Sequence, residues 1–144
     1  MSLIIRPLGL PDLENGLRET YENLSPVGDV PLTRLERIHL LRAAIPSVYR
    51  TLVAVTETQV VSTVTLLLEQ KFIHEGGLAG HIEDVATRQG YERRGIARTL
   101  MARAEEVARA GGCYKMILDC AEHNVLFYKR LGYHVHEICM RKDL

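Results

Sequence analysis

A turn rich in arginine, YERRGIAR at residues 91–98, precedes the longest helical pattern of the sequence and surrounds Gly95 with Arg93, Arg94 and Arg98. At a helix N-terminus four backbone N–H groups lack partners and the helix dipole is positive. A phosphate-bearing ligand can bind there, with the arginines as counter-charges. The alternative is an exposed, arginine-rich helix start, and one glycine in a basic turn does not separate the two.

Two adjacent carboxylates, Glu83 and Asp84, interrupt the apolar segment HIEDV. Side chains alternate along a strand, so these two point to opposite faces and at least one should meet the covered side of a sheet. A buried carboxylate is costly unless it has a partner. We therefore interpret the pair as functional.

Other polar residues allow both a functional and a structural interpretation. Tyr128 can be a core aromatic residue on a helix stripe, and Asp119 can simply end a strand. His74, close to Lys71 in the sequence, can be a turn residue or a polar contact to a substrate.

Metal binding is not predicted. His134 and His136 share one face of a predicted strand, but no carboxylate or cysteine lies at ligand spacing from them. The cysteines, Cys113, Cys120 and Cys139, also lack metal-type spacing, and we interpret them as small apolar side chains.

Length and composition restrict the class of protein. The 144 residues fit one domain, residues 1–144. Eighteen Lys and Arg balance eighteen Asp and Glu, so we expect neither a nucleic acid nor a membrane as partner. The apolar runs are all shorter than the roughly twenty residues of a membrane span. The odd number of cysteines and the absence of a signal-like start lead us to expect a reducing, cytoplasmic setting.

Hydrophobic periodicity predicts alternating strands and helices. Strands are predicted over residues 3–6, 51–55, 60–73, 78–87, 114–120 and 134–141. Helices are predicted over residues 11–24, 33–45, 96–110 and 124–132. Thr33 and Glu36 have the spacing of a capping box. This order predicts an α/β (α+β) fold, with a mixed central sheet flanked by helices.

Three linked segments carry a family resemblance: KFIHEGGLAGHIEDVA, GGCYKMILDC and NVLFYKRLGY. Together with the strand order and the glycine-containing turn, they resemble the GNAT superfamily of acetyl-coenzyme A-dependent N-acetyltransferases. The resemblance covers residues 66–142 closely and the N-terminal half loosely. It implies the GNAT fold and acetyl-coenzyme A (acetyl-CoA) as cosubstrate, with no metal.

The family's pyrophosphate motif, Q/R-x-x-G-x-G/A, falls on residues 92–97. Gly95 and Ala97 fit the motif, whereas Glu92 departs from it and Arg93 replaces a common glycine. A carboxylate beside a diphosphate should weaken binding unless it points to solvent, and Arg93 can offset that loss. The resemblance implies coenzyme contacts from Asp84, Val85, Ala86, Glu92, Arg93, Arg94, Gly95, Ile96, Ala97, Asn124 and Tyr128.

The resemblance also implies a mechanism, in which an amine attacks the acetyl thioester directly, without a covalent enzyme intermediate. Such a reaction needs a neutral amine, a polarised carbonyl and a stabilised leaving thiolate. The implied catalytic residues are Tyr128 for the thiolate, Asp119 for favouring a reactive amine, and Glu83. The implied acceptor is D-glucosamine 6-phosphate, whose acetylation is a step toward UDP-N-acetylglucosamine. The implied substrate contacts are Ser25, Lys71, Phe72, Ile73, His74, Glu83, Asp84, Lys115, Asp119 and Arg141.

Two further expectations concern partners and rival functions. The resemblance implies a homodimer with shared active sites, in which Asp119 and Arg141 reach the neighbour's acceptor pocket. One rival is an enzyme of the same fold that acetylates another amine, and the other is a non-catalytic acyl-CoA sensor. Three cations, Lys71, Lys115 and Arg141, favour a phosphorylated acceptor, because a polyamine site would be mostly acidic.

Overall fold

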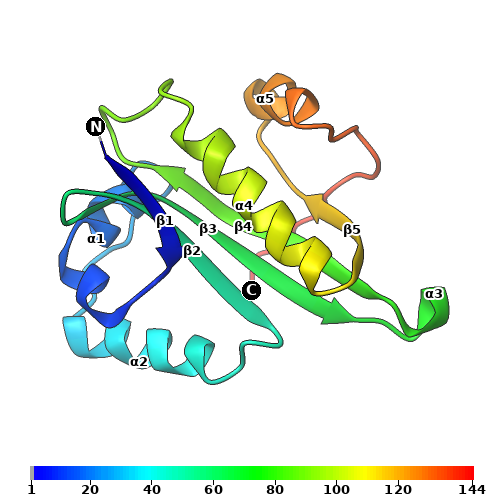
Figure 1. Cartoon of the computed structure of the whole chain (residues 1–144), viewed down its shortest axis with the longest axis horizontal. Helices are drawn as coiled ribbons and strands as arrows, with labels where there is room; N and C mark the ends of the chain where they lie inside the picture. Colours follow the sequence, from blue (N-terminus) through cyan, green and yellow to red (C-terminus); the bar gives the residue numbers. More distant parts are fainter. Residues whose placement is uncertain (1) are drawn as a thin grey trace.

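The computed structural model describes residues 2–144. Its sheet consists of β1 (Leu3–Pro7), β2 (Tyr49–Thr56), β3 (Gln59–Gln70), β4 (Leu78–Thr87) and β5 (Cys113–Leu118), in that spatial order (Figure 1). Neighbouring strands from β1 to β4 are antiparallel, whereas β4 and β5 are parallel. The predicted mixed sheet is therefore confirmed.

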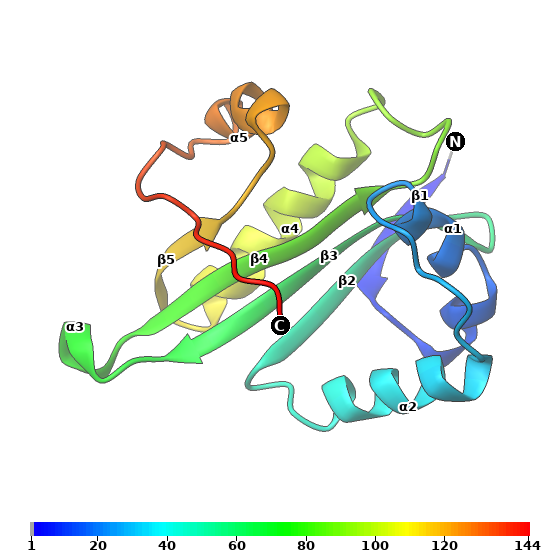
Figure 2. The same ribbon diagram turned by 180° about the vertical axis from the view of Figure 1, so that it is seen from behind.

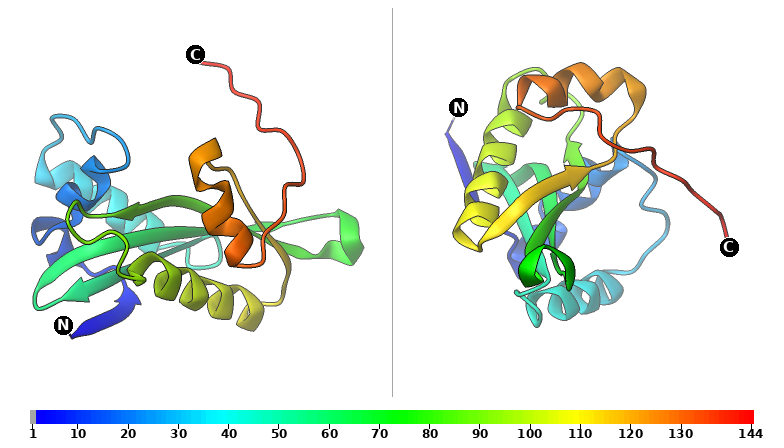
Figure 3. Two further views of the ribbon diagram at one scale, coloured as in Figure 1. Left: turned by 90° about the horizontal axis from the view of Figure 1, so that it is seen from above. Right: turned by 90° about the vertical axis from the view of Figure 1, so that its right-hand side faces the viewer.

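Helices flank both faces of the sheet, as the sequence predicts. They are α1 (Leu17–Glu22), α2 (Leu32–Ala43), α3 (Ile73–Gly76), α4 (Ile96–Ala110) and α5 (Val125–Arg130), with the short 3₁₀ helices η1 (Leu10–Glu14) and η2 (Glu122–Asn124). Figure 3 shows α4 on one face of the sheet and α1 and α2 on the other.

The core consists of alternating strand residues packed against these helices. Leu66 of β3 and Ile82 of β4 oppose each other and belong to one buried cluster with Leu100 of α4. Val53 points to the opposite face, where it joins Leu17 of α1. Successive side chains of a strand alternate between faces, so the residues next to Leu66 and Ile82 face away from α4.

The helix predicted over residues 11–24 is wrong as a continuous element. It is divided into η1 and α1 at Gly16, whose φ of 93° is left-handed. A Cβ at Gly16 would lie 2.7 Å from the Val60 carbonyl oxygen, so only glycine fits this close approach to β3. The capping box at Thr33 and Glu36 is also wrong, because α2 begins after Pro31 without a side-chain cap.

Two strands end earlier than the prediction. The third predicted strand ends at Gln70, because His74 and Glu75 adopt left-handed φ values of 52° and 59° in the following turn. β5 ends at Leu118, which leaves Asp119 and the residue after it beyond the strand.

The final strand predicted over residues 134–141 does not form within the part of the chain that the structure describes. Its apolar side chains are exposed to 72% at Val135 and to 87% at both Ile138 and Met140. Figure 2 shows this C-terminal tail on the face of the sheet away from α4, and Figure 3 shows its end extending away from the sheet. A strand needs a neighbouring strand for its backbone N–H and C=O groups, and none pairs with the tail in residues 2–144.

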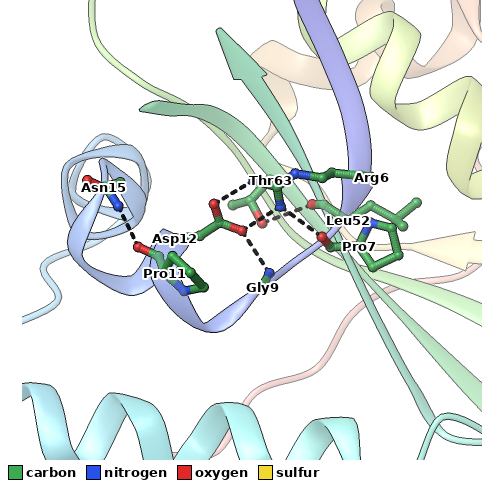
Figure 4. A network of polar contacts seen from close by, with 8 residues as sticks. All are labelled: Arg6, Pro7, Gly9, Pro11, Asp12, Asn15, Leu52 and Thr63. Atoms are coloured by element: carbon green, nitrogen blue, oxygen red, sulfur yellow. Dashed lines mark hydrogen bonds and ion pairs between the residues drawn. The ribbon is translucent and has the colours of Figure 1, made fainter. Parts of the chain in front are cut away.

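A partly buried ion pair links the first strand to η1 (Figure 4). The Arg6 guanidinium donates to both carboxylate oxygens of Asp12, at 2.6 and 2.8 Å, and the Gly9 N–H donates to one of them at 2.7 Å. Asp12 is only 3% exposed. Burial alone would raise the pKa of Asp12, but the bonds from Arg6 and Gly9 outweigh it and lower that pKa. The pair therefore attaches η1 to β1.

Candidate active site

An irregularity in β4 creates the centre of the site. Thr63 pairs with Ala86 and Thr65 with Glu83, so one residue of β3 opposes two residues of β4. This is a β-bulge, and its Asp84 has a left-handed φ of 49°. The pairing between β4 and β5 ends at Ile82, so the residues of β4 from the bulge onward have no strand partner on the β5 side within residues 2–144. Backbone groups there are available to a ligand.

Three carboxylates meet at this point, although they come from two strands. Glu83 and Asp84 belong to the bulge, and Asp119 follows β5 one residue after the Leu118 that pairs with Ile82. Glu83 and Asp84 are both exposed, so the expected burial of at least one of them is wrong. Partial desolvation, and then the charges of Asp84 and Asp119, still raise the pKa of Glu83. A carboxyl group with a raised pKa is better able to accept a proton from an amine.

Tyr128 lies on α5 as a buried side chain, 9% exposed. Its ring makes edge contacts with Phe127 and Tyr133, at centroid distances of 5.0 and 5.9 Å. Burial, with a smaller effect of Cys120, raises the pKa of the hydroxyl, which therefore stays protonated at neutral pH. A hydroxyl in this state can donate a hydrogen bond to a leaving group.

One cavity of about 670 Å³ lies between β5, α5 and the C-terminal tail, and Asp119 is the member of the acidic cluster that lines it. Its lining includes Lys115 and Asp119 from the β5 region, Tyr128 from α5 and Cys139 from the C-terminal tail. The Asp119 carboxylate beside Cys139 raises the pKa of that thiol. The tail therefore lies over the same end of β5 as the carboxylates.

The turn before α4 has the backbone shape of an anion site. Gly90, Arg93 and Gly95 all have left-handed φ values, of 88°, 59° and 76°. Gly95 is the residue that precedes α4, and no side chain caps the helix there. No atom of residues 2–144 lies within 4 Å of the Cβ position at Gly95, so the backbone is open to a close approach. Successive N–H groups in such a turn form a concave anion site.

Glu92 does not lie free in this turn. Its carboxylate accepts hydrogen bonds from the Gly90 N–H at 2.7 Å and from the Asn23 side chain at 2.9 Å. Its own backbone N–H and then Asn23 hold the pKa of Glu92 below its usual range. The negative charge of Glu92, the residue that differs from the family motif, is thus stabilised by hydrogen-bond donors of the protein.

The loop after β3 contains four of the expected substrate contacts, and two of their side chains are largely exposed. The Lys71 ammonium contacts Glu69 at 3.1 Å, and the His74 ring packs on Tyr114 at a centroid distance of 4.6 Å. Phe72 is fully exposed and Ile73 is mostly exposed, so neither side chain reaches into the described chain. Lys115 lies over the Tyr114 ring, 5.5 Å from its centroid.

Three of the expected residues do not line the cavity. Arg141 is exposed in the tail, where its ion pair is with Asp143 at 2.7 Å. Ser25 is exposed in the loop between α1 and α2. Asn124 precedes α5, as the sequence predicts, but its side chain does not cap the helix. The roles of these residues stay predictions.

Sequence reasoning missed polar residues on the same face as Glu83. His81 Nε2 lies 2.8 Å from Glu69 Oε1, which links β4 to β3 and to Lys71. Arg42 of α2 donates to the hydroxyl of Thr65 at 3.1 Å, and Thr65 pairs with Glu83. For the contact between His81 and Glu69, the only indication in the sequence was that His81 and Glu83 lie on either side of Ile82 and so share a face.

No group of three or more His, Cys, Asp or Glu side chains in residues 2–144 is arranged to hold a metal ion. Over the same residues, none of the helices combines the length and the apolar character needed to cross a membrane.

Comparisons with known proteins agree with this geometry. Residues 10–133 match the family model described as "Acetyltransferase (GNAT) family". A glucosamine 6-phosphate N-acetyltransferase of Candida albicans is 35% identical over 129 residues, which cover 89% of this chain and 87% of that protein. The crystal structure of glucosamine-6-phosphate N-acetyltransferase from Arabidopsis thaliana is similar with a TM-score of 0.95, at 28% identity and covering 99% of each chain. An acetyltransferase of Trypanosoma brucei has a TM-score of 0.91 at 32% identity, covering 99% of this chain and 100% of that chain.

Proposed function

Because the chain belongs to the GNAT family of acetyltransferases, we propose that it transfers the acetyl group of acetyl-CoA to the amine of D-glucosamine 6-phosphate. The products are N-acetyl-D-glucosamine 6-phosphate and coenzyme A. The relatives from Candida albicans and Arabidopsis thaliana are named as glucosamine 6-phosphate N-acetyltransferases, which supports this acceptor. The observation that carries the proposal is the cluster of Glu83, Asp84 and Asp119 at the diverging ends of β4 and β5, next to the cavity that contains Tyr128.

The coenzyme would lie along β4 and end at the bulge. The turn at residues 90–97 presents left-handed backbone and arginines for a pyrophosphate. Backbone groups of Asp84 to Ala86, which lack a strand partner toward β5, would orient the pantetheine arm and thioester. This placement brings the sulfur toward the cavity lined by Tyr128.

The acceptor amine must be neutral before it attacks. Glu83 is suited to favour that form, because its pKa is raised by partial desolvation and by the neighbouring carboxylates. The amine then attacks the thioester carbonyl carbon; a C–N bond forms and the C–S bond breaks. The Tyr128 hydroxyl stabilises or protonates the departing thiolate, and the proton lost by the amine passes to a carboxylate or solvent.

Cations near the acceptor end favour a phosphorylated substrate. Lys71 and Lys115 come from the β3–β4 loop and β5, and Arg141 comes from the tail. Phosphate paired with such groups forms charge-assisted hydrogen bonds. The rival acceptors are other amino sugars, polyamines and protein N-termini.

A panel of amines tests the acceptor. With acetyl-CoA and purified protein, free thiol release should be at least about tenfold faster with glucosamine 6-phosphate than with glucosamine, because only the former offers a dianionic phosphate. Equal rates for the two sugars would refute the phosphate requirement. Release with spermidine alone would favour the polyamine rival, and no release with any amine would favour the acyl-CoA sensor.

We also propose that the working unit is a homodimer in which the tail of each chain completes the partner's acceptor pocket. The tail has apolar residues in a strand-like pattern, and these residues are exposed in the single chain. The outer edge of β5 pairs with no strand in residues 2–144. An unpaired edge and an unpaired strand of this kind can join between two copies. Arg141 is the residue that we assign to the partner's pocket. Asp119 already influences Glu83 of its own chain, so its expected contribution to the neighbour stays a prediction.

Mixing two inactive variants tests the shared pocket. Random pairing of Tyr128→Ala and Arg141→Ala chains gives mixed dimers that each contain one intact pocket, which restores roughly a quarter of wild-type activity by symmetry counting. Each variant alone, refolded in the same way, is the control. If Arg141 served its own chain, every pocket would contain one lesion and no activity would return. A monomer in light scattering at the assay concentration would also refute the dimer.

A further inference from the structure

One pair of side chains joins the turn before α4 to the end of α1. Glu92 Oε1 accepts from the Asn23 side-chain amide at 2.9 Å, and Glu92 Oε2 accepts from the Gly90 N–H at 2.7 Å. The same Asn23 amide donates to the Thr87 carbonyl at 2.7 Å. We call these contacts the Asn23–Glu92 brace. It connects α1, the last residue of β4 and the arginine-rich turn.

The brace explains how a carboxylate fits in an anion-binding turn. Both Glu92 oxygens are engaged by donors, and the backbone N–H groups that act on the carboxylate belong to Gly90 and to Glu92 itself, ahead of residues 93–97. The N–H groups of residues 93–97 are therefore not taken by this carboxylate. Arg93, adjacent in the sequence, acts on Glu92 as a counter-charge and lowers its pKa further.

The turn that the brace holds contains a strained backbone conformation. Arg93 adopts a φ of 59°, which an L-residue other than glycine rarely adopts without support from its surroundings. Gly90, at 88°, begins the same turn. Because Glu92 lies between these two residues and binds the Gly90 N–H, its carboxylate supports the left-handed turn that precedes the N–H groups of residues 93–97.

At its other end the brace meets the loop that contains Ser25. Asn23 is the residue that follows α1. The loop beyond it is tied back to α1, since Arg18 donates to the Gly28 carbonyl at 2.9 Å and the Val27 N–H donates to Glu22 at 3.0 Å. A loop held in this way moves with α1, so a shift of Asn23 displaces the loop as well.

We propose that Glu92 is a positioning residue, and that the Asn23–Glu92 brace couples the affinity for the coenzyme to the affinity for the acceptor. This inference rests on the proposed function, which places the coenzyme at the turn, and on the acceptor contact that the family resemblance implies at Ser25, in the loop that follows Asn23. The competing explanation is that Glu92 simply repels the diphosphate. The two explanations predict opposite effects of removing the carboxylate.

Two single variants and their combination separate these explanations. Asn23→Ala breaks the brace and keeps the charge, whereas Glu92→Ala removes both. If the brace positions the turn, each variant raises the dissociation constant for coenzyme A about three- to tenfold, and the double variant is no worse than the weaker-binding single variant. The KM for the acceptor rises in the same variants. Glu19→Gln is the matched control, because it removes an exposed carboxylate of α1 that makes no hydrogen bond within residues 2–144, and it should change neither constant.

Tighter coenzyme binding by Glu92→Ala would overturn the brace in favour of repulsion. Additive effects in the double variant, or an unchanged acceptor KM in both singles, would overturn the coupling.

Hydrogen exchange in the ligand-free protein separates a failure of the brace from a failure of the proposed function. The Gly90 amide should exchange slowly in the wild type, and at least about tenfold faster in Glu92→Ala. Absence of coenzyme binding to the wild type would refute the proposed function, whereas protection of Gly90 would still support the contact. Equal exchange of Gly90 in the wild type and in Glu92→Ala would overturn the brace, whatever the enzyme binds.

Discussion

Replacing Tyr128 with phenylalanine removes one hydroxyl and keeps the buried ring. Tyr128 lines the cavity, and its hydroxyl is not among buried polar atoms without a partner in residues 2–144, so its removal should change the free energy of unfolding by less than about 0.5 kcal/mol. A preorganised donor to a developing negative charge contributes far more to the rate, and its loss should lower kcat about ten- to a thousandfold, or about 1.4 to 4 kcal/mol of barrier. The affinity for coenzyme A should stay nearly unchanged, because the interaction forms only as the thiolate leaves.

The assay is thiol release under single-turnover conditions, with calorimetry for coenzyme A and thermal unfolding for stability. Tyr133→Phe is the matched control, because Tyr133 lies 5.9 Å from Tyr128 between ring centroids and burial raises its pKa to about 12. That variant loses the same atom without touching the proposed leaving group, so its turnover should stay near that of the wild type. An unchanged kcat for Tyr128→Phe in a chemistry-limited assay would refute the role and leave Tyr128 as a core residue.

Two further predictions concern the ion pair and the turn. Arg6→Met should lower the free energy of unfolding at pH 7 by about 2 to 3 kcal/mol, because it leaves the buried Asp12 carboxylate with too few donors, while the partial exposure of Arg6 reduces the effect. The pKa of Asp12 is lowered by folding, so its stabilisation is present above the unfolded pKa of about 4 and is lost as the pH falls through the folded pKa. In urea titrations the difference in the free energy of unfolding between variant and wild type should therefore become smaller in acid. A difference that does not change with pH would contradict the assignment. Gly95→Trp should raise the dissociation constant for coenzyme A at least about tenfold in calorimetry, because a side chain would fill the open approach to the turn, and an unaltered constant would mean that the pyrophosphate binds elsewhere.

The elements that the sequence predicted well depend on local patterns. β4 has the predicted bounds of residues 78–87, and α4 has the predicted bounds of residues 96–110. In α4 the apolar stripe and the terminal glycines are all contained in the segment, so no distant contact is needed to place its ends. The breaks at Gly16 and after Gln70 were missed, because they depend on a close approach to β3 and on a left-handed turn at His74.

The candidate site was predictable where a motif carried it and not where two distant segments meet. Glu83 and Asp84 stand out as carboxylates in an apolar strand, and the β4–β5 register then brings Asp119 to them. The contact between Glu69 and His81 depends on the β3–β4 register, which the spacing of residues does not specify. Asn23 and Glu92 are 69 residues apart in the sequence. Neither residue type predicts that contact, because it forms only when α1 and the turn fold onto the same end of the sheet.

The C-terminal tail shows a different limit of prediction. Its alternation of apolar and polar residues is that of a strand, yet the structure leaves residues 134–141 unpaired and their apolar side chains exposed. Strand formation is a property of a pair, because backbone donors and acceptors must be satisfied by a neighbour. The pattern therefore indicates that the tail can pair as a strand. It does not specify which chain supplies the neighbouring strand. In the proposed dimer the neighbour supplies it, so the strand pattern and the unpaired tail of one chain are compatible, and the same pairing would bring Arg141 to the partner's acceptor pocket.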